Sequence, residues 1–299
     1  SSFLGTDYGG YIIYGGHYCL RLEFYSLWPS RWRNREILIM NSPNELIFYS
    51  TDNEAEVFES CYKLRLPLLL KGPTGCGKSQ FVEFMANKLN RPLIKVACNE
   101  DTNAADLIGR FLIQNGETVW QDGPVTRAIK SNALLYLDEF AEAREDVIVA
   151  LHPLTDHRRE IYIDKINSTL KATDEFMLVA SYNPGYQKGL KEIKPSTKQR
   201  FIVLAMNYLA TEKEKDLLIA LTGVEKKWAE QLSQLAYKIR SKEDLMLKET
   251  ISTRLIVNAA LMIKHGMNPR KACHIAISEV LSDDRQIVTS INDFINLHI

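Results

Sequence analysis

Residues 72–79 read GPTGCGKS and match the pattern G-x-x-x-x-G-K-S/T at each of its fixed positions. Glycines at these spacings allow several backbone N–H groups to turn inward, as the binding of a triphosphate requires. In such a loop Lys78 reaches the β- and γ-phosphates, and the Ser79 hydroxyl binds Mg²⁺. The sequence therefore predicts a phosphate-binding loop made by Gly72, Pro73, Thr74, Gly75, Cys76, Gly77, Lys78, Ser79 and Gln80.

Two acidic residues, Asp138 and Glu139, follow the apolar stretch 133–137, about 60 residues after Lys78. Parallel α/β sheets place their ligands at the carboxyl ends of the strands, so both carboxylates are expected near the phosphate loop. Asp138 is then suited to hold Mg²⁺, and Glu139 to orient and polarise an attacking water. An exposed acidic pair at a strand end is the alternative, and the phosphate loop upstream argues against it.

Asn183 follows another apolar stretch, residues 176–181. At the tip of a strand its amide could bind the γ-phosphate or the attacking water. On local grounds alone a turn residue before Pro184 is the better interpretation, so both roles stay open. Aromatic residues near Tyr49 could flank an adenine ring, and an ordinary core role is equally compatible with the sequence.

A strand, a loop and a helix must position these side chains, and the flanking sequence predicts them. Residues 66–70 form an apolar run that is too short for a helix and suits a buried strand. After the loop, apolar residues recur at helical spacing through residue 90. The expected strands lie at 92–98, 133–137, 176–181 and 201–206, with a short edge strand at 45–50, and the expected helices lie at 54–64, 104–107, 122–130, 142–154 and 195–201.

Two further segments alternate between apolar and polar residues, as the strands of β-hairpins do. Asn115 and Gly116 separate two alternating runs within residues 109–121, which is a strong hairpin signal. Contact with a substrate through Phe111 or Trp120, and a packed flap, are both compatible with this insertion. Residues 156–174 read as a second hairpin, with its first strand beginning at residue 156.

From residue 207 onward the apolar spacing is helical. Residues 228, 232, 235 and 239 recur at i, i+4, i+7 and i+11. Residues 250–264 predict a second helix that stops before Gly266, Asn268 and Pro269 start the next one, and residues 284–299 predict the last. We therefore expect three parts: an extension at 1–44, an α/β nucleotide-binding domain at 45–206 and a helical lid at 207–299.

Composition limits the classes of partner. The 299 residues are 45% apolar and 25% charged, and the 37 basic and 37 acidic residues cancel. Zero net charge gives no general reason to expect nucleic acid or an anionic membrane. No apolar run approaches 18 residues, so no membrane span is expected. The five cysteines form no C-x-x-C pair, which favours a reducing cytoplasm over a disulfide framework or a zinc site.

Residues 1–39 mix Tyr, Gly, Trp and Arg without a steady period. They have neither the basic start nor the apolar block of a signal peptide. An upstream leader, a poorly specified extension and an oligomerisation arm all remain open, and we assign no chemistry to this segment.

The stretches GPTGCGKS, LLYLDE, SYNPG and PSTKQRF, followed by ISTR at 251–254, resemble the AAA+ ATPases of the MoxR group. The stretches DLIGRFLIQNGETVWQDGPVTRA and HPLTDHRR narrow the resemblance to the CbbQ/NirQ/NorQ branch, over roughly residues 45–299. The resemblance implies ATP and Mg²⁺ as ligands. It also implies an α/β P-loop core with a parallel five-stranded sheet flanked by helices, two β-hairpin insertions and a C-terminal helical lid.

The resemblance further implies a role for each matching position. Ser79 and Asp138 correspond to the Mg²⁺ ligands, and the hairpin at 109–121 matches an insertion that faces the pore of a ring. The arginine finger of such proteins acts on the nucleotide of the neighbouring subunit. Five positions correspond to catalytic residues: Lys78 of Walker A, Glu139 of Walker B, Asn183 as sensor 1, Arg200 as the arginine finger and Arg254 as sensor 2.

Members of this branch form rings, typically hexamers, and remodel a client enzyme together with a von Willebrand factor A domain protein. The resemblance implies a bacterial cytoplasmic protein, and no motif separates the two client classes. We take Rubisco as the first hypothesis, with a carboxysome association if that is the client, and nitric oxide reductase as the alternative. Two other classes compete with this hypothesis. A small-molecule phosphotransferase would share the phosphate loop, and a non-hydrolysing scaffold would bind nucleotide without cleaving it.

Overall fold

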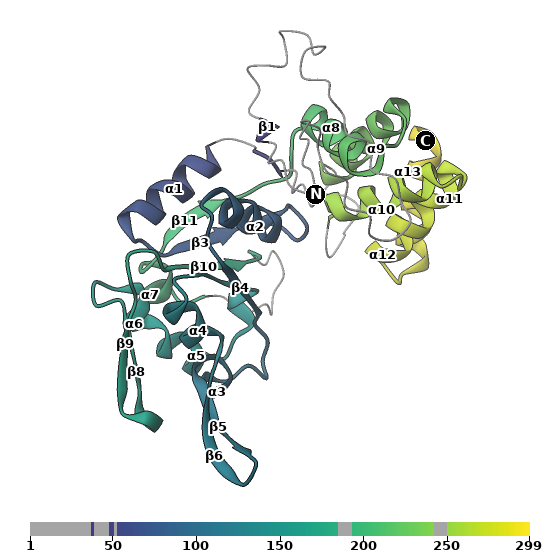
Figure 1. Ribbon diagram of the computed structural model, residues 1–299. Coiled ribbons are helices and arrows are strands. Elements are labelled where there is room, and N and C mark those ends of the chain that lie inside the picture. Colours follow the sequence, from purple (N-terminus) through teal and green to yellow (C-terminus); the bar gives the residue numbers. More distant parts are fainter. Residues whose placement is uncertain (1–36, 39–47, 51–52, 185–192, 242–249) are drawn as a thin grey trace, which may run out of the picture. The chain divides into compact units, whose positions relative to one another are not determined.

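The computed structural model of the protein describes residues 37–38, 48–50, 53–184, 193–241 and 250–299 (Figure 1). Residues 37–299 form one compact unit. The predicted extension at 1–44 lies outside the described residues except for β1 (Ile37–Leu38), which pairs antiparallel with β2 (Phe48–Tyr49). The predicted edge strand at 45–50 is therefore only two residues long, and it pairs with β1 rather than with the main sheet.

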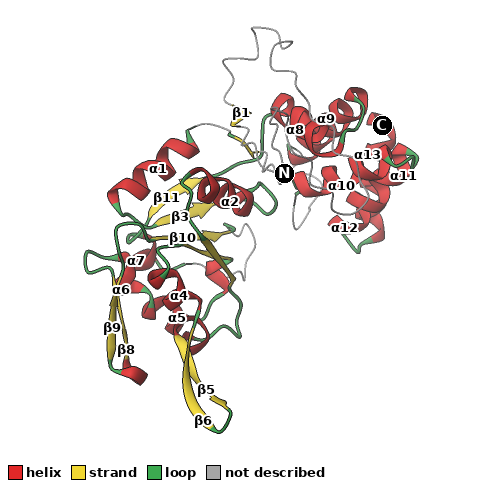
Figure 2. Cartoon of the chain, viewed as in Figure 1, coloured by secondary structure: helices red, strands yellow, loops and turns green. Residues whose placement is uncertain are grey.

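The main sheet has five strands, and every adjacent pair is parallel (Figure 2). Parallel pairing is possible because a helix-containing connection returns the chain to the same edge before each new strand. The strands lie in the order β11 (Ile202–Ala205), β3 (Leu68–Lys71), β10 (Met177–Tyr182), β7 (Leu134–Asp138) and β4 (Leu93–Ala97). The predicted α/β class and the five-stranded parallel sheet are confirmed.

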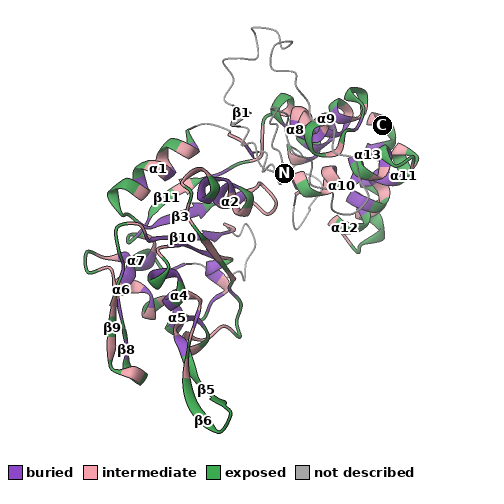
Figure 3. Ribbon diagram, in the orientation of Figure 1, coloured by how far each residue is buried: buried purple, intermediate pink, exposed green. Residues whose placement is uncertain are grey.

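Both faces of this sheet are covered, which is why its strands read as continuous apolar runs (Figure 3). Leu68 and Leu70 belong to one apolar cluster and Leu69 belongs to another, because successive side chains of a strand point to opposite faces. The first cluster includes residues of α1 (Glu54–Leu64) and α2 (Lys78–Lys88), and the second includes residues of the helices on the other face. Those helices include α3 (Ala104–Ile108), α4 (Pro124–Lys130) and α5 (Glu145–Ala150).

The single helix expected over 142–154 is wrong. The chain forms a 3₁₀ turn at Phe140–Glu142, then α5, then a separate short helix α6 (His152–Thr155). Ala143 and Arg144 are extended between the turn and α5. Pro153 has no N–H to donate to the preceding turn, so α5 and α6 cannot continue as one helix.

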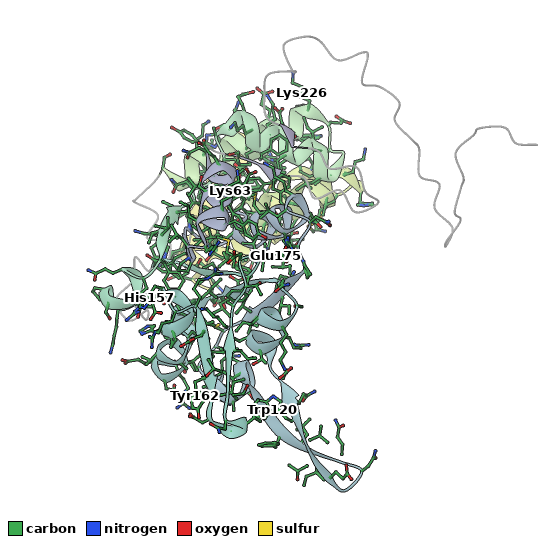
Figure 4. The ribbon with its side chains drawn as sticks, turned by 60° about the vertical axis from the view of Figure 1, so that its left-hand side comes forward. Lys63, Trp120, His157, Tyr162, Glu175 and Lys226 are labelled. Carbon is green, nitrogen blue, oxygen red and sulfur yellow. The ribbon has the colours of Figure 1, made fainter. Side chains whose placement is uncertain are left out.

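Both hairpins are present and extend away from the five-stranded sheet (Figure 1). The first pairs β5 (Gly109–Gln114) with β6 (Glu117–Asp122), and its turn residues Asn115 and Gly116 have φ of 52° and 86°, as a two-residue hairpin turn requires. The second pairs β8 (Glu160–Ile163) with β9 (Ser168–Lys171). Its first strand begins four residues later than predicted, because residues 156–159 form a turn closed by a hydrogen bond from Arg159 N to Asp156 O. Figure 4 marks Trp120 on the first hairpin and Tyr162 on the second.

After α7 (Pro195–Lys198) and β11, the described chain is helical and has an apolar core of its own. The second of the predicted helices starts three residues later than expected, and Gly266 (φ 91°) follows it as predicted. Asn268 caps the next helix by accepting a hydrogen bond from Lys271 N. No helix among the described residues is long and apolar enough to cross a membrane. The helices are α8 (Thr211–Thr222), α9 (Lys226–Arg240), α10 (Thr253–Lys264), α11 (Pro269–Cys273), a π-turn at His274–Ser278, α12 (Glu279–Leu281) and α13 (Arg285–His298).

Candidate active site

Three neighbouring strands bring the predicted site residues together. β3, β10 and β7 are adjacent and parallel, so their carboxyl ends lie at the same edge of the sheet. The phosphate loop follows β3, Asn183 follows β10, and the pair Asp138–Glu139 ends β7. Residues more than a hundred positions apart in the sequence thereby come within hydrogen-bonding distance of one another.

The phosphate loop leads directly into α2, which begins at Lys78. Gly75 and Gly77 have φ of 69° and 97°, in the left-handed region that side chains other than glycine rarely adopt. These two residues turn the loop so that the amino end of α2 follows it at once. The arrangement offers backbone N–H groups and the positive end of a helix to a phosphate.

The Lys78 side chain is already oriented along the loop. Its ammonium group donates to Gly72 O (2.9 Å), Pro73 O (2.9 Å) and Asn183 Oδ1 (2.7 Å), which uses all three of its donors. Burial lowers the pKa of Lys78, while the nearby carboxylates Asp138 and Glu139 act to raise it. A phosphate entering the loop would exchange its oxygens for these acceptors. The structure thus brings Asn183 to Lys78, beyond what a turn residue before a proline would require.

Asp138 accepts hydrogen bonds on both carboxylate oxygens. Oδ2 accepts from the Ser79 hydroxyl (2.9 Å), and Oδ1 accepts from the hydroxyls of Tyr136 (2.9 Å) and Ser181 (2.5 Å) and from the Glu139 N–H (3.1 Å). Burial acts to raise the pKa of Asp138, but the three hydroxyl donors prevail and hold it below its ordinary value. Asp138 is therefore ionised at neutral pH. Its carboxylate and the Ser79 hydroxyl supply the oxygen ligands that suit Mg²⁺.

Glu139 is held in a left-handed conformation, with φ of 53° and ψ of 41°. A residue other than glycine in this region stores roughly 1–3 kcal/mol of backbone strain, and such strain gathers at functional sites. The Glu139 side chain is exposed and lines the same pocket as the phosphate loop. Its carboxylate is thus accessible from the position where a γ-phosphate and a water would lie.

These residues line a pocket of about 280 Å³ that also takes in residues of the helical region. Gly72 and Pro73 do not line it and act through their carbonyl groups on Lys78. Of the residues predicted from the sequence, the pocket gathers Thr74, Gly75, Cys76, Gly77, Lys78, Ser79, Gln80, Asp138, Glu139, Asn183 and Arg254. The further lining residues are Phe48, Tyr49, Leu209, Leu217, Leu221, Thr253 and Val257, of which only the Tyr49 region was considered from the sequence.

Arg200 lies elsewhere. It follows α7, is exposed, and is not among the residues that line the pocket. Its Nη1 lies 3.8 Å from Asp156 Oδ2, at the base of the second hairpin. Arg158 forms the closer pair with the same carboxylate (2.6 Å) and lowers the pKa of Asp156 to about 2, so Asp156 stays negative beside Arg200.

The sequence analysis did not identify two residues that donate hydrogen bonds to Asp138. Tyr136 and Ser181 are buried polar groups in otherwise apolar strands, and their hydroxyls lie 2.9 Å apart. Their positions in the sequence could have identified them. Tyr136 lies two residues before Asp138, and Ser181 lies two residues before Asn183. Alternate residues of a strand share a face, so both hydroxyls had to point the same way as the site.

The parallel sheet, the phosphate loop and the acidic pair after β7 define a P-loop ATPase of the AAA class. A family model described as "AAA domain (dynein-related subfamily)" matches residues 67–201, and a second, "CbbQ/NirQ/NorQ C-terminal", matches residues 214–298. The chain therefore belongs to the CbbQ/NirQ/NorQ family and is an ATP hydrolase. The phosphotransferase and the non-hydrolysing scaffold gain no support from these matches.

Curated relatives match over most of their length. The chain is 50% identical to the denitrification regulatory protein NirQ of Pseudomonas aeruginosa, over 84% of this chain and 97% of that protein. It is 48% identical to protein NorQ of Paracoccus denitrificans, over 81% of this chain and 89% of that protein. It is also 48% identical to protein CbbQ of Hydrogenophilus thermoluteolus, over 81% and 90% respectively. These relatives confirm the family predicted from the sequence motifs.

Solved structures support the fold. A RuvB mutant from Thermotoga maritima superposes with a TM-score of 0.50 at 16% sequence identity, covering 83% of this chain and 71% of that one. At this level of identity the match concerns the fold alone, which agrees with the AAA assignment.

Proposed function

We propose that this protein assembles into a ring, typically a hexamer, and couples ATP hydrolysis to the remodelling of a client enzyme. One observation carries the proposal: Arg200 is exposed and outside the pocket of its own chain, while Lys78 and Asn183 are already joined within that pocket. Because Arg200 is exposed and lies outside its own pocket, its guanidinium is available to bind the nucleotide held by a neighbouring copy of the chain. Identical chains that meet head to tail close into rings, which places one such cation at every site.

Each pocket residue has a distinct task in the proposed reaction. Lys78 exchanges its three present acceptors for oxygens of the β- and γ-phosphates, and Asn183, held next to it, lies where it can orient the γ-phosphate or the water. Glu139 polarises the attacking water. Arg254, which lines the pocket from the start of α10, binds the γ-phosphate from the lid. Together these groups position and neutralise the triphosphate, which is most of what phosphoryl transfer to water requires.

Ser79 and Asp138 would hold Mg²⁺ in this site. Their side chains lie 2.9 Å apart, and Asp138 is kept ionised by its hydroxyl donors. The bound ion would neutralise charge on the phosphate oxygens. Tyr136 and Ser181 keep the carboxylate oriented toward Ser79, so the pair is ready before nucleotide arrives.

Arg200 completes the site from the adjacent subunit. In related phosphoryl-transfer enzymes an arginine supplied in this way raises the rate by roughly 10³–10⁵-fold. In the single chain, the carboxylate of Asp156 lies 3.8 Å from the guanidinium of Arg200. Because Asp156 lies at the base of the β8–β9 hairpin, engagement of Arg200 with a neighbour's nucleotide links hydrolysis to that hairpin.

No sequence motif separates the two client classes, and we propose Rubisco as the first client, acting with a von Willebrand factor A domain protein. The chain is 48% identical to the relative named CbbQ, which bears the name of the branch whose resemblance implied this client. The relatives named for denitrification, at 50% and 46% identity, support the second client class, with nitric oxide reductase as the candidate. The comparisons give no support to a carboxysome location, which is not part of the proposal.

Two substitutions test the reaction. Glu139→Gln should bind ATP with wild-type affinity and release phosphate at less than about a hundredth of the wild-type rate, because the water loses its base. Arg200→Ala should also bind ATP and lose turnover. Arg144→Ala removes an arginine that is likewise exposed and paired with an aspartate, and it should leave turnover unchanged. Wild-type phosphate release by Glu139→Gln or Arg200→Ala would refute the corresponding role.

The client is tested with purified enzymes. The protein, with a von Willebrand factor A domain partner and ATP, should restore activity to inhibited Rubisco, whereas Glu139→Gln should not. Failure with Rubisco together with maturation of nitric oxide reductase would move the proposal to the second client. Failure with both, while ATP is hydrolysed, would refute both client assignments.

A further inference from the structure

Tyr208 connects the helical region to the phosphate loop. It lies between β11 and α8, and its hydroxyl donates to the carbonyl oxygen of Thr74 at 2.8 Å. Thr74 is a phosphate-loop residue that lines the pocket. The Tyr208 ring lies against the guanidinium of Arg240, whose central carbon is 3.9 Å from the ring centre. Since Arg240 is the last residue of α9, the end of a lid helix is stacked on a side chain that touches the loop.

The edge of the same guanidinium makes three hydrogen bonds. Nη1 and Nη2 donate to the two carboxylate oxygens of Glu214 (2.8 and 2.9 Å), and Nε donates to Ile251 O (2.9 Å). Glu214 is completely buried, and a buried carboxylate is strongly unfavourable unless it is paired and hydrogen-bonded. It accepts a further hydrogen bond from the Thr253 hydroxyl at 2.6 Å. We call Tyr208, Glu214, Arg240 and Thr253 the Arg240 cluster.

The cluster holds the start of α10, which lies directly on the phosphate loop. Thr253 is the first residue of α10, and Arg254 follows it. A Cβ added to Gly75 would lie 2.6 Å from Cβ of Ser252 and 3.8 Å from Cβ of Arg254, so only a glycine leaves room for this approach. Arg254 and Lys78 both line the pocket.

We propose that the Arg240 cluster is a positioning element of the ATP site, which fixes the start of α10, and with it Arg254, against the phosphate loop. The inference rests on the proposed role of Arg254 at the γ-phosphate. One guanidinium holds both contacts, with its face on Tyr208 and its edge on Glu214, and lysine could not reproduce this geometry.

The test measures ATP and ADP affinities of Thr253 variants in a Glu139→Gln background, where turnover is blocked. Thr253→Val removes the hydroxyl that fixes the start of α10 to Glu214, whereas Thr253→Ser retains it. Thr253→Val should lose about tenfold in ATP affinity, the size expected for a hydrogen bond to a charged group, with ADP affinity unchanged. Thr253→Ser should keep the wild-type ratio of ATP to ADP affinity. A role in stability alone would lower the melting temperature without changing this ratio.

Three further variants complete the experiment. Tyr208→Phe removes only the hydroxyl on Thr74 O and should weaken both nucleotides, while Tyr237→Phe, on the exposed side of α9, should change neither. Arg254→Ala should abolish the preference for ATP. If it keeps the preference, the proposed role of Arg254 is wrong. If it loses the preference while Thr253→Val keeps it, the ATP site stands and the positioning inference is overturned.

Discussion

Removal of one hydroxyl, in Tyr136→Phe, tests how the carboxylate of Asp138 is held. The phenol oxygen lies 2.9 Å from Asp138 Oδ1, 2.9 Å from Ser181 Oγ and 3.2 Å from Ser79 Oγ, and it has one proton to donate. The aromatic ring stays in place, so no cavity forms. Asp138 keeps the donors Ser79, Ser181 and Glu139 N–H, but it loses the side-chain donor that comes from its own strand.

The expected effect follows from this geometry. A hydrogen bond to a charged group contributes about 1.5–3 kcal/mol, which is roughly a 10- to 150-fold change in an equilibrium constant. Residues that orient the ligands of a metal typically account for about 10–100-fold in metal affinity or activity. Because three donors to Asp138 remain, we expect the lower end. Tyr136→Phe should need about tenfold more Mg²⁺ for half-maximal ATP hydrolysis, with little change in melting temperature.

The assay is a Mg²⁺ titration of phosphate release, paired with a Mg²⁺ titration of the binding of a fluorescent ATP analogue. Tyr162→Phe is the matched control, because the Tyr162 hydroxyl is bonded to Asn167 on an exposed hairpin and should not affect either titration. A wild-type Mg²⁺ requirement in Tyr136→Phe would show that the phenol does not orient Asp138. A large fall in melting temperature without a changed Mg²⁺ requirement would show that its role is structural.

Three other substitutions give distinct outcomes. Gly75→Ala places a Cβ 2.6 Å from Ser252 in a left-handed backbone and should abolish nucleotide binding by calorimetry. Gly223→Ala is also left-handed, but its Cβ would meet only the Lys264 side chain, at 3.8 Å, so it should cost about 1 kcal/mol of stability and leave binding intact. Ile113→Ser, at a hairpin residue that is 81% exposed, should change stability by less than about 0.5 kcal/mol and leave basal ATP hydrolysis unchanged, yet reduce activation of the client. The pKa of Asp156 is lowered to about 2, so its stabilising contribution is complete above its unfolded pKa and is lost only as the pH falls through about 2. The melting-temperature difference between wild type and Asp156→Asn should therefore persist from pH 8 to pH 5, and a difference that shrinks as the pH falls across this range would contradict the assignment.

The parts of the site that the sequence predicts are those encoded locally. The phosphate loop, the acidic pair at 138–139 and the Asn115-Gly116 turn each need particular residue types at fixed spacing, because glycine conformations and strand ends are short-range properties. The order of the elements then places the loops that follow β3, β7 and β10 at the same edge of the sheet. Even the single error among the longer helices, at 142–154, has a local cause in Pro153.

The remaining parts depend on contacts between distant segments. No spacing rule relates Tyr208 to Thr74 or Arg240 to Glu214, since each pair meets only when the helical region packs against the phosphate loop or upon itself. The apolar wall of the pocket has the same origin, because residues such as Leu217 read from the sequence as ordinary core positions of an amphipathic helix. Only the structure shows which of them face the nucleotide.

The central claim is that each site is completed by Arg200 of an adjacent copy, and a mixing experiment tests it most directly. Arg200→Ala and Glu139→Gln should each be inactive alone. In mixed rings a site works where its own chain retains Glu139 and its neighbour supplies Arg200, which is about one quarter of the interfaces in a random equimolar assembly of head-to-tail subunits. Recovery of turnover toward that fraction is the predicted result. Co-assembled rings that stay as inactive as the two separate variants would contradict the claim.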